Sequence, residues 1–348
     1  MKYNKVRNII KETINRQGLL ARGDSIVMGV SGGPDSICLF DVLADLAPEW
    51  ELKLYPVHIN HCFRPGAAEA DQDYTERFTA GRGFPCESRV VDCSAMASEL
   101  GMTSEEAGRK ARYDAFYDRC RRLAEEGVDR QKIKIAVAHN ANDQVETVLF
   151  RILRGTGTDG LTGMEYSRRE GEYSVVRPLL DVRREDIEEY CECKGLNPAR
   201  DHTNEEAIYA RNKIRLELLP YLEREYNENI AGALLRLRDI AASDKEFIWQ
   251  SVEEAAERLR LEGEGEIVLE RQGLAELHES IRHRVVMKSF GEVGLTSDIT
   301  AERLAAADRI IMKKQGPKTV EFPGGYRLKV AAGKVHIGKH ALDKRCES

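Results

Sequence analysis

A short run of glycines, serines and one aspartate stands where an apolar segment gives way to a helical pattern. The apolar segment is 25–30 (SIVMGV), and the residues after 36 (ICLFDVLADL) have helical spacing. Glycines let backbone N–H groups approach an anion closely, proline suits the first helical position, and serines add hydroxyl donors. We therefore predict a phosphate-binding turn at the start of a helix, formed by Ser31, Gly32, Gly33, Pro34, Asp35 and Ser36.

The carboxylate of Asp35 adds a second requirement to this turn. A carboxylate beside a polyphosphate is repelled unless a cation such as Mg²⁺ lies between them, so the turn implies a divalent metal ion at Asp35. The turn is not a Walker A loop, because it lacks the lysine of that motif. A plain helix cap, in which the serines satisfy free amide groups, is the alternative interpretation.

Polar side chains also follow two other apolar segments. We interpret His58 and His61, at the end of one segment, as parts of a loop. Asp143 and Glu146 follow the segment 134–139, and their spacing places both carboxylates on one face in the first turn of a predicted helix. Acids also simply favour the start of a helix, so that simpler interpretation stays open.

A glycine-rich string at 155–160 (GTGTDG) formally matches the dinucleotide-binding fingerprint. That fingerprint must follow a strand and open a helix, whereas this string follows the helical pattern VETVLFRILR. We therefore interpret Gly155 and Gly157 as parts of a flexible substrate loop.

Short β-branched and apolar runs alternate with helical patterns in the first 155 residues. The runs are 25–30, 52–59, 86–91 and 134–139, and the helical patterns lie near 34–46, 67–82 and 103–125. Runs that are apolar on both faces indicate buried parallel strands, so we predict a doubly wound α/β fold. Ligands bind beyond the carboxyl ends of the strands in such folds, which is where the polar loops lie.

We divide the chain into an α/β domain at 1–220 and a mainly helical domain at 221–348. Within the first, RPLLDVRREDIEEYCECKG is predicted to form a short strand followed by a helix at 183–193. The second has helical patterns at 227–262, 276–290 and 298–313, and alternating apolar residues at 318–339 predict a terminal meander of two or three strands.

The formal net charge of −6 argues against indiscriminate coating of nucleic acid. Between 313 and 345, however, nine Lys or Arg residues stand against two acids, a local charge of +7 that could bind a polyanion or be a solvated face. No apolar run approaches the roughly 20 residues of a membrane span, and no signal-peptide pattern is present. We expect a cytoplasmic protein, with the eight cysteines reduced and the C-x-C pair at 191–193 without a metal.

Several motifs, taken with the turn SGGPDS, resemble the tRNA(Ile)-lysidine synthetase family of PP-loop ATP pyrophosphatases. They are VHINHCFR, EEAGRKARYDAFYD, AHNANDQVETVLFRILRGTGTDGLTGM, VRPLL and DHTN with ARNKIR, in this order. The resemblance covers about 20–220 and continues more weakly into the helical domain. Nothing resembles the additional terminal domain of longer members, so we expect a short form of the family.

The resemblance implies a two-step ligation. ATP adenylates the C2 oxygen of the wobble cytidine in the CAU anticodon of isoleucine tRNA, and the ε-amine of L-lysine then displaces AMP to give lysidine. ATP and Mg²⁺ are thus expected at 31–36, and a C-terminal tRNA-binding role is expected for 221–348. A homodimer is also a possible oligomeric state of the chain.

The resemblance also carries residue roles. Asp143 and Glu146 fall on an acidic pair that can hold a cationic amino acid, and Arg112 with Arg109 falls on an arginine motif associated with the activated nucleotide and lysine. Because the lysine amine must lose a proton before it attacks, Asp143 is the first choice of proton acceptor and His139 the alternative. The expected catalytic residues are Asp35, Asp143, Glu146, Arg112 and His139. The expected lysine and tRNA contacts are Asp143, Glu146, Arg109, Arg112, Gly155, Gly157, Arg211 and Arg215.

Two rival functions remain. A PP-loop tRNA sulfurtransferase would also adenylate a base, but it usually needs paired cysteines, and the chain has no C-x-x-C. A regulatory module that holds ATP without turnover is disfavoured by the acidic and basic groups at several strand ends.

Overall fold

The computed structural model describes residues 3–63, 66–199, 210–313 and 318–339 of the 348-residue chain. The chain divides into two compact units, Met1–Asp239 and Ile240–Ser348. No helix in the described part of the chain is both long and apolar enough to cross a membrane.

The first unit is built on a six-stranded sheet in the order β3-β2-β1-β4-β6-β5. Its strands are β1 (Ser25–Gly29), β2 (Lys53–Asn60), β3 (Glu87–Val90), β4 (Ile133–Ala136), β5 (Ser167–Glu170) and β6 (Tyr173–Val176). All neighbours pair in parallel except β5, which pairs antiparallel with β6. The predicted doubly wound α/β fold is confirmed, with one antiparallel edge strand added.

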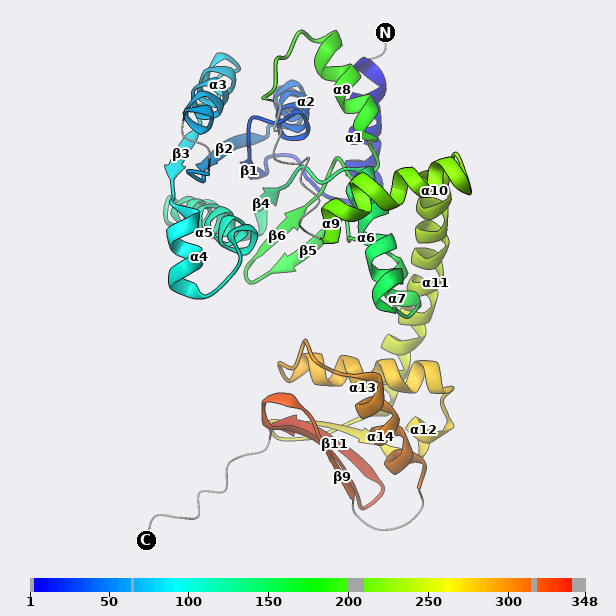
Figure 1. Ribbon diagram of the computed structural model, residues 1–348. Coiled ribbons are helices and arrows are strands. Elements are labelled where there is room, and N and C mark those ends of the chain that lie inside the picture. The colour runs from blue at the N-terminus through cyan, green and yellow to red at the C-terminus, as the bar shows by residue number, and fades with distance from the viewer. Residues whose placement is uncertain (1–2, 64–65, 200–209, 314–317, 340–348) are drawn as a thin grey trace. The chain divides into compact units, whose positions relative to one another are not determined.

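Helices cover both faces of this sheet (Figure 1). They are α1 (Tyr3–Gln17), α2 (Pro34–Trp50), α3 (Ala67–Gly81), α4 (Cys93–Leu100), α5 (Ser104–Glu125), α6 (Ala141–Arg154), α7 (Thr158–Leu161) and α8 (Arg184–Cys193), with a 3₁₀ turn at Arg130–Lys132. The core cluster on one face joins α1, α2 and α8, and the cluster on the other face joins α4 and α5. Apolar residues on both sides of β1, such as Ile26 and Val27, are fully buried because each face has its own helical layer.

Two parts of the first unit differ from the sequence-based prediction. The hairpin of β5 and β6 lies between the glycine string at 155–160 and RPLL, where we predicted no strand. The strand that we predicted at RPLL is wrong: β6 ends at Val176, and residues 178–180 form a turn. The short alternation SRRE and YSVV gave little signal because these strands have four residues each.

We expected the division of the chain near 220, whereas the first unit extends to Asp239. It retains α9 (Ala210–Lys213), a π-helical segment at Ile214–Leu218, α10 (Leu219–Glu225) and the beginning of α11 (Ile230–Leu259). Leu234 and Ile214 pack against Val145 and Val148 of α6, and the guanidinium of Arg238 lies 4.7 Å from the ring centroid of Tyr166. These contacts explain why the start of α11 belongs to the first unit.

The second unit packs helices on a five-stranded antiparallel sheet in the order β7-β8-β11-β10-β9. The strands are β7 (Arg260–Leu261), β8 (Ile267–Glu270), β9 (Lys318–Glu321), β10 (Tyr326–Ala331) and β11 (Lys334–Lys339), and the helices besides the rest of α11 are α12 (Arg271–Glu276), α13 (Glu279–Glu292), α14 (Ala301–Met312) and a 3₁₀ turn at Pro323–Gly325. The expected meander is β9–β11. The added strands β7 and β8 come from a stretch that carried no clear alternation.

Candidate active site

The turn after β1 has a backbone that favours glycine. Gly32 has a φ of +88°, and a Cβ at this position would lie 3.1 Å from Thr75 Oγ1 and 3.5 Å from the Asp71 carbonyl oxygen. Helix α2 starts at Pro34 with Gly33 as its N-cap, so no side chain caps its first N–H groups. These N–H groups and the partial positive charge of the helix start can bind an anion.

Hydrogen bonds inside the turn hold its shape. Ser36 Oγ donates to the Gly33 carbonyl oxygen at 3.0 Å and accepts the Ser31 N–H at 3.1 Å. The buried ring of His58 donates through Nδ1 to the Val30 carbonyl oxygen at 2.8 Å. Ser36 and His58 therefore shape the turn, while Ser31 is the hydroxyl-bearing residue that remains exposed.

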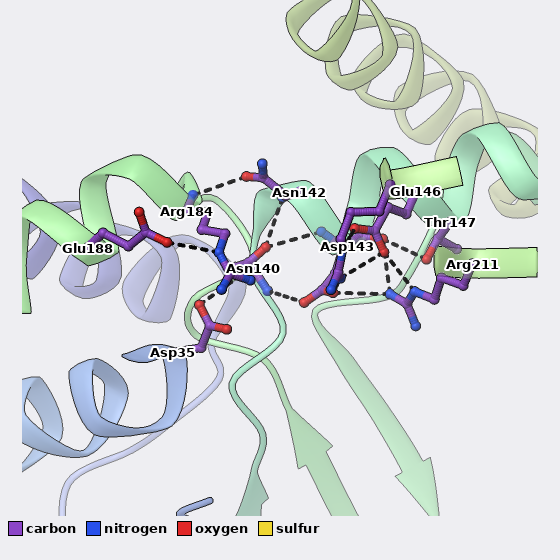
Figure 2. A network of polar contacts seen from close by, with 10 residues as sticks. Asp35, Asn140, Asn142, Asp143, Glu146, Thr147, Arg184, Glu188 and Arg211 are labelled. Atoms are coloured by element: carbon purple, nitrogen blue, oxygen red, sulfur yellow. Dashed lines mark hydrogen bonds and ion pairs between the residues drawn. The ribbon is translucent and has the colours of Figure 1, made fainter. Parts of the chain in front are cut away.

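Asp35 and Asn140 connect the turns that follow β1 and β4, which are neighbours in the sheet. Asn140 Nδ2 donates to Asp35 Oδ1 at 2.9 Å, and Figure 2 shows the two side chains pointing toward each other. The strand order changes direction between β1 and β4, and such a switch point is where doubly wound folds bind ligands. Burial raises the pKa of Asp35, and the hydrogen bond from Asn140 opposes that rise.

Asn140 also starts helix α6. Its side-chain oxygen accepts the N–H groups of Asn142 at 2.9 Å and Asp143 at 3.1 Å, while Asp143 Oδ2 accepts the Asn140 N–H at 3.0 Å. This reciprocal capping fixes Asp143 in the first turn of the helix. One residue, Asn140, therefore sets the position of Asp143 relative to Asp35.

The acidic pair is occupied by two arginines of the chain itself. Glu146 binds Arg211 Nε at 2.9 Å and Arg215 Nε at 2.5 Å, and Asp143 Oδ1 lies 3.2 Å from Arg211 Nη2 and 3.4 Å from Arg215 Nη2. Figure 2 shows Arg211 reaching both carboxylates. All four residues were candidates in the sequence, but their pairing could not be predicted, because the arginines are more than 60 positions from the acids.

The two carboxylates of this cluster differ in how deeply they are buried. The Glu146 side chain is 1% exposed, whereas that of Asp143 is 16% exposed and makes the longer arginine contacts. Glu146 is therefore the member that anchors the arginines. Asp143 is the member that an incoming ligand can share.

A group of cations surrounds His139 at the end of β4. Burial lowers the pKa of His139 to about 3, and the charges of Arg177, Arg211, Arg109 and Arg112 contribute to the lowering in that order. Arg109 and Arg112 come from α5, where the guanidinium of Arg109 lies 4.8 Å from the ring centroid of Tyr113. The predicted arginine motif and the predicted histidine thus share one positively charged region.

Arg177 is a member of this region to which sequence reasoning gave no role. Its side chain is buried, and it directly follows β6, next to β4 in the sheet. A charged residue within the otherwise apolar run VVRPLL was the signal that could have identified it.

The glycine string after α6 does not reach this cluster. Gly155 caps the C-terminal end of α6, whereas Asp143 lies in its first turn, and a helix of 14 residues is about 20 Å long. The loop is also more ordered than expected, because it contains α7 and because Arg151 donates to the carbonyl oxygens of Gly160 at 2.9 Å and Gly163 at 2.7 Å.

A glycine substitution tests this ordered loop. Gly163 has a φ of +64°, and a Cβ there would lie 2.3 Å from Gln144 Oε1, the buried amide that accepts the Met164 N–H at 2.6 Å. We expect Gly163→Ala to lower the free energy of unfolding by about 3 kcal/mol, from the left-handed backbone and the broken hydrogen bonds together. Urea unfolding followed by Trp50 fluorescence in a Trp249→Phe background measures it.

Gly171→Ala is the matched control, because Gly171 also has a positive φ of +61° but has no atom within 4 Å of its added Cβ. It should cost only about 1 kcal/mol. Equal losses for the two variants would show that Gln144 does not order the loop.

The residues around Asp35 suit a magnesium ion shared with a nucleotide. Among the described residues, no group of three or more His, Cys, Asp or Glu side chains is arranged to hold a metal ion. Mg²⁺ in nucleotide sites, however, uses one or two carboxylates together with phosphate oxygens and water. Asp35 meets that requirement, since its Oδ2 accepts no hydrogen bond from the part of the chain that the structure describes.

The fold and the site together define a PP-loop protein. The sheet is mainly parallel, the glycine-serine turn after β1 has no side-chain cap and no Walker lysine, and polar residues lie at the β1/β4 switch point. The PP-loop domain family matches residues 2–222 of the chain. Curated relatives narrow the assignment. A Clostridium tetani protein named tRNA(Ile)-lysidine synthase is 36% identical over 337 residues, which cover 95% of this chain and 68% of that protein. The chain belongs to the tRNA(Ile)-lysidine synthase family.

Two other comparisons set the scope of this assignment. The tRNA(Ile)-lysidine synthase of Clostridioides difficile (strain 630) is 38% identical over 286 residues, covering 82% of this chain and 60% of that protein. The chain thus spans about 60% of the length of such relatives. A U34-tRNA thiolase of Methanococcus maripaludis, which holds a [4Fe-4S] cluster, has the same fold with a TM-score of 0.50 at 16% identity, covering 68% of this chain and 79% of that one.

Proposed function

We propose that this chain catalyses the ATP-dependent joining of L-lysine to the wobble cytidine in the CAU anticodon of an isoleucine tRNA. The reaction passes through an adenylated cytidine and releases pyrophosphate and AMP. The hydrogen-bonded link from Asp35 through Asn140 to Asp143 is the observation that carries this proposal, because it joins a phosphate-binding turn to an acidic pair. Family membership supports the same reaction.

In the first step, the cytidine C2 oxygen attacks the α-phosphorus of ATP and pyrophosphate leaves. The turn 31–36 and the first N–H groups of α2 hold the phosphates, and Asp35 is the residue that would hold Mg²⁺. Bound Mg²⁺ supplies charge stabilisation for the leaving pyrophosphate. Arg109 and Arg112 provide further positive charge toward the α-phosphate.

In the second step, the ε-amine nitrogen of lysine bonds to C2 of the cytidine and the C2–O bond to AMP breaks. Asp143, the more exposed and more loosely paired carboxylate, receives the lysine ammonium and takes its proton. Glu146, Arg211 and Arg215 keep that carboxylate in place. The arginines also leave the acidic pair electrically neutral before lysine arrives, so lysine has to share Asp143 with them.

The proposed reaction also bears on location and assembly. We place the activity in the cytoplasm, where tRNA, ATP and free lysine are available together. A homodimer is an arrangement that sedimentation of the purified chain would test.

Pyrophosphate exchange tests the first step without lysine. The chain should incorporate labelled pyrophosphate into ATP only when Mg²⁺ and an unmodified isoleucine tRNA with a CAU anticodon are present. Exchange that is independent of tRNA would indicate that another group is adenylated. No exchange and no AMP under any condition would favour an ATP-holding module without turnover.

The basic segment of the second unit is proposed to contact tRNA. In the described part of this segment, Arg327, Lys329 and Lys334 lie on one face of the sheet, as the pairing register of β10 with β11 requires. Glu270 and Glu321 lie opposite Lys334 and Arg327, so the face is less positive than the sequence count suggested. Lys314, Lys344 and Arg345 of the expected segment lie outside the described residues.

Replacing Arg327, Lys329 and Lys334 with glutamine should weaken tRNA binding and flatten its salt dependence. The slope of log affinity against log salt should fall by roughly 0.7–0.9 for each phosphate that is no longer neutralised. Filter binding of tRNA between low and physiological salt measures the slope. The control variant, Lys318→Gln with Lys339→Gln, removes charges whose register partners, Val330 and Tyr326, lie on the other face. If the triple variant binds like the control, the face is only solvated.

A further inference from the structure

Arg177 is a buried cation that forms no ion pair with a carboxylate in the part of the chain that the structure describes. The residue is 4% exposed. Nη1 donates to the Glu165 carbonyl oxygen at 2.7 Å, and Nε donates to His139 Nδ1 at 3.2 Å. Burial is the largest influence on the pKa of Arg177 and lowers it, and the charge of Glu165 opposes that lowering only weakly. A buried charge without a close counter-ion is costly, so its retention indicates that negative charge comes to it from a ligand.

The contact between Arg177 and His139 settles where the imidazole carries its proton. A guanidinium N–H can only donate, so Nδ1 of His139 must accept and cannot hold a proton. The neutral ring then has its proton on Nε2, on the side away from Arg177. Nε2 has no hydrogen-bond partner among the described residues, and the ring is half-buried.

The charges that lower the pKa of His139 are those of Arg177, Arg211, Arg109 and Arg112, which come from the turn after β6, from α9 and from α5. Arg211 is also paired with Asp143 and Glu146 of α6. All four are cations. They oppose a second proton on the ring, and they attract an anion to the same place. An Nε2–H inside such a group is suited to a phosphoryl oxygen.

We propose that Arg177 is a positioning residue that fixes His139 as a neutral, Nε2-protonated imidazole, and that this Nε2–H donates to a phosphoryl oxygen of the adenylated nucleotide. His139 is thus a hydrogen-bond donor in the adenylation step and not the acceptor of the lysine proton. The identity of the ligand in this inference rests on the proposed function, whereas the assignment of the tautomer rests only on contacts within the chain. Arg177 acts through His139 and stabilises charge that develops as pyrophosphate and AMP leave.

The tautomer is tested on the full chain by ¹⁵N spectroscopy of labelled histidines. The chain has eight histidines, and the signal that disappears in His139→Gln assigns the ring. We expect an unprotonated Nδ1, a protonated Nε2, and no titration between about pH 5 and 8, since burial and the arginines hold the pKa of His139 at about 3. A proton on Nδ1, or a titration near pH 6.5, would overturn the inference.

Arg177→Met should remove the hydrogen bond to Nδ1 of His139. The pKa of His139 should rise but stay below the ordinary value of about 6.5, because burial and the other three arginines remain, and both tautomers should become populated. Arg169→Met is the matched control, because Arg169 is an exposed arginine of the adjacent strand and should leave the His139 spectrum unchanged. If Arg177→Met does not fold, the spectrum of the unmodified chain still decides the question.

The donor role is tested by comparing His139→Gln with His139→Ala in single-turnover formation of adenylated tRNA. Alanine should slow adenylation by roughly 10²-fold, as expected when a transition-state donor is removed. Glutamine can donate but cannot accept a proton at neutral pH, so it should stay within about 10-fold of the unmodified chain. A glutamine variant that adenylates normally but fails as badly as alanine in lysine transfer would make His139 the base. A chain that forms no adenylated tRNA but shows the expected spectrum would contradict the proposed function and leave the tautomer standing.

Discussion

Asp35→Asn should reduce the release of pyrophosphate and AMP by roughly 10³-fold, equivalent to about 4 kcal/mol of transition-state stabilisation. The substitution removes the negative charge that we propose holds Mg²⁺ beside the phosphates. It keeps the shape of the side chain, and an asparagine oxygen can still accept the hydrogen bond that Asn140 Nδ2 now makes at 2.9 Å. Pyrophosphate release under saturating ATP, with circular dichroism as a check of folding, measures the effect.

Asp45→Asn is the matched control for this variant. Asp45 lies on the same helix, α2, but pairs with Lys194 at 3.0 Å, away from the turn. It should release pyrophosphate at nearly the normal rate. If Asp35→Asn is as active as this control, the metal-binding assignment of Asp35 is wrong.

Glu146→Gln and Asp143→Asn should have different effects, because Glu146 mainly anchors the two arginines and Asp143 is proposed to act in lysine transfer. Glu146 is 1% exposed and binds both arginines, so its neutralisation should lower the free energy of unfolding by about 2 kcal/mol. This is below the usual cost of breaking a buried ion pair, because Arg211 and Arg215 both reach solvent. Asp143→Asn should cost less stability, since its arginine contacts are longer and asparagine can still cap Asn140.

The activities should rank in the opposite order. Asp143→Asn should slow lysine transfer from preformed adenylated tRNA by about 10²-fold and raise the KM for lysine, because it removes the proposed lysine-binding charge and proton acceptor. Adenylation should change little in either variant. Rapid-quench measurements of the two steps decide this, and an equal loss of adenylation would show that the acidic pair serves the nucleotide instead.

The sequence was most informative where local chemistry and position coincide. The string 31–36 predicts a glycine turn after a strand because backbone conformation, helix start and anion binding all depend on neighbouring residues, and Gly32 indeed has a φ of +88°. Strands β1, β2 and β4 were recognisable because most of their residues are buried on both faces, whereas β3 has no buried residue.

Contacts between distant segments could not be predicted in the same way. Arg211 and Arg215 were expected to face a substrate, yet they bind Asp143 and Glu146 of α6, and spacing along the chain contains no information about that pairing. His139 was considered as a base because its residue type permits that role. Only the position of Arg177, 38 residues later, shows that Nδ1 is an acceptor of a fixed hydrogen bond.

Incorporation of labelled lysine into tRNA tests the central claim most directly. The chain is incubated with ATP, Mg²⁺, labelled lysine and unmodified isoleucine tRNA with a CAU anticodon, and AMP and acid-precipitable lysine are counted together. The proposed function predicts one lysine retained per AMP released, with incorporation abolished when the wobble cytidine is replaced by uridine. AMP release without retained lysine, or equal retention by the uridine tRNA, would contradict it.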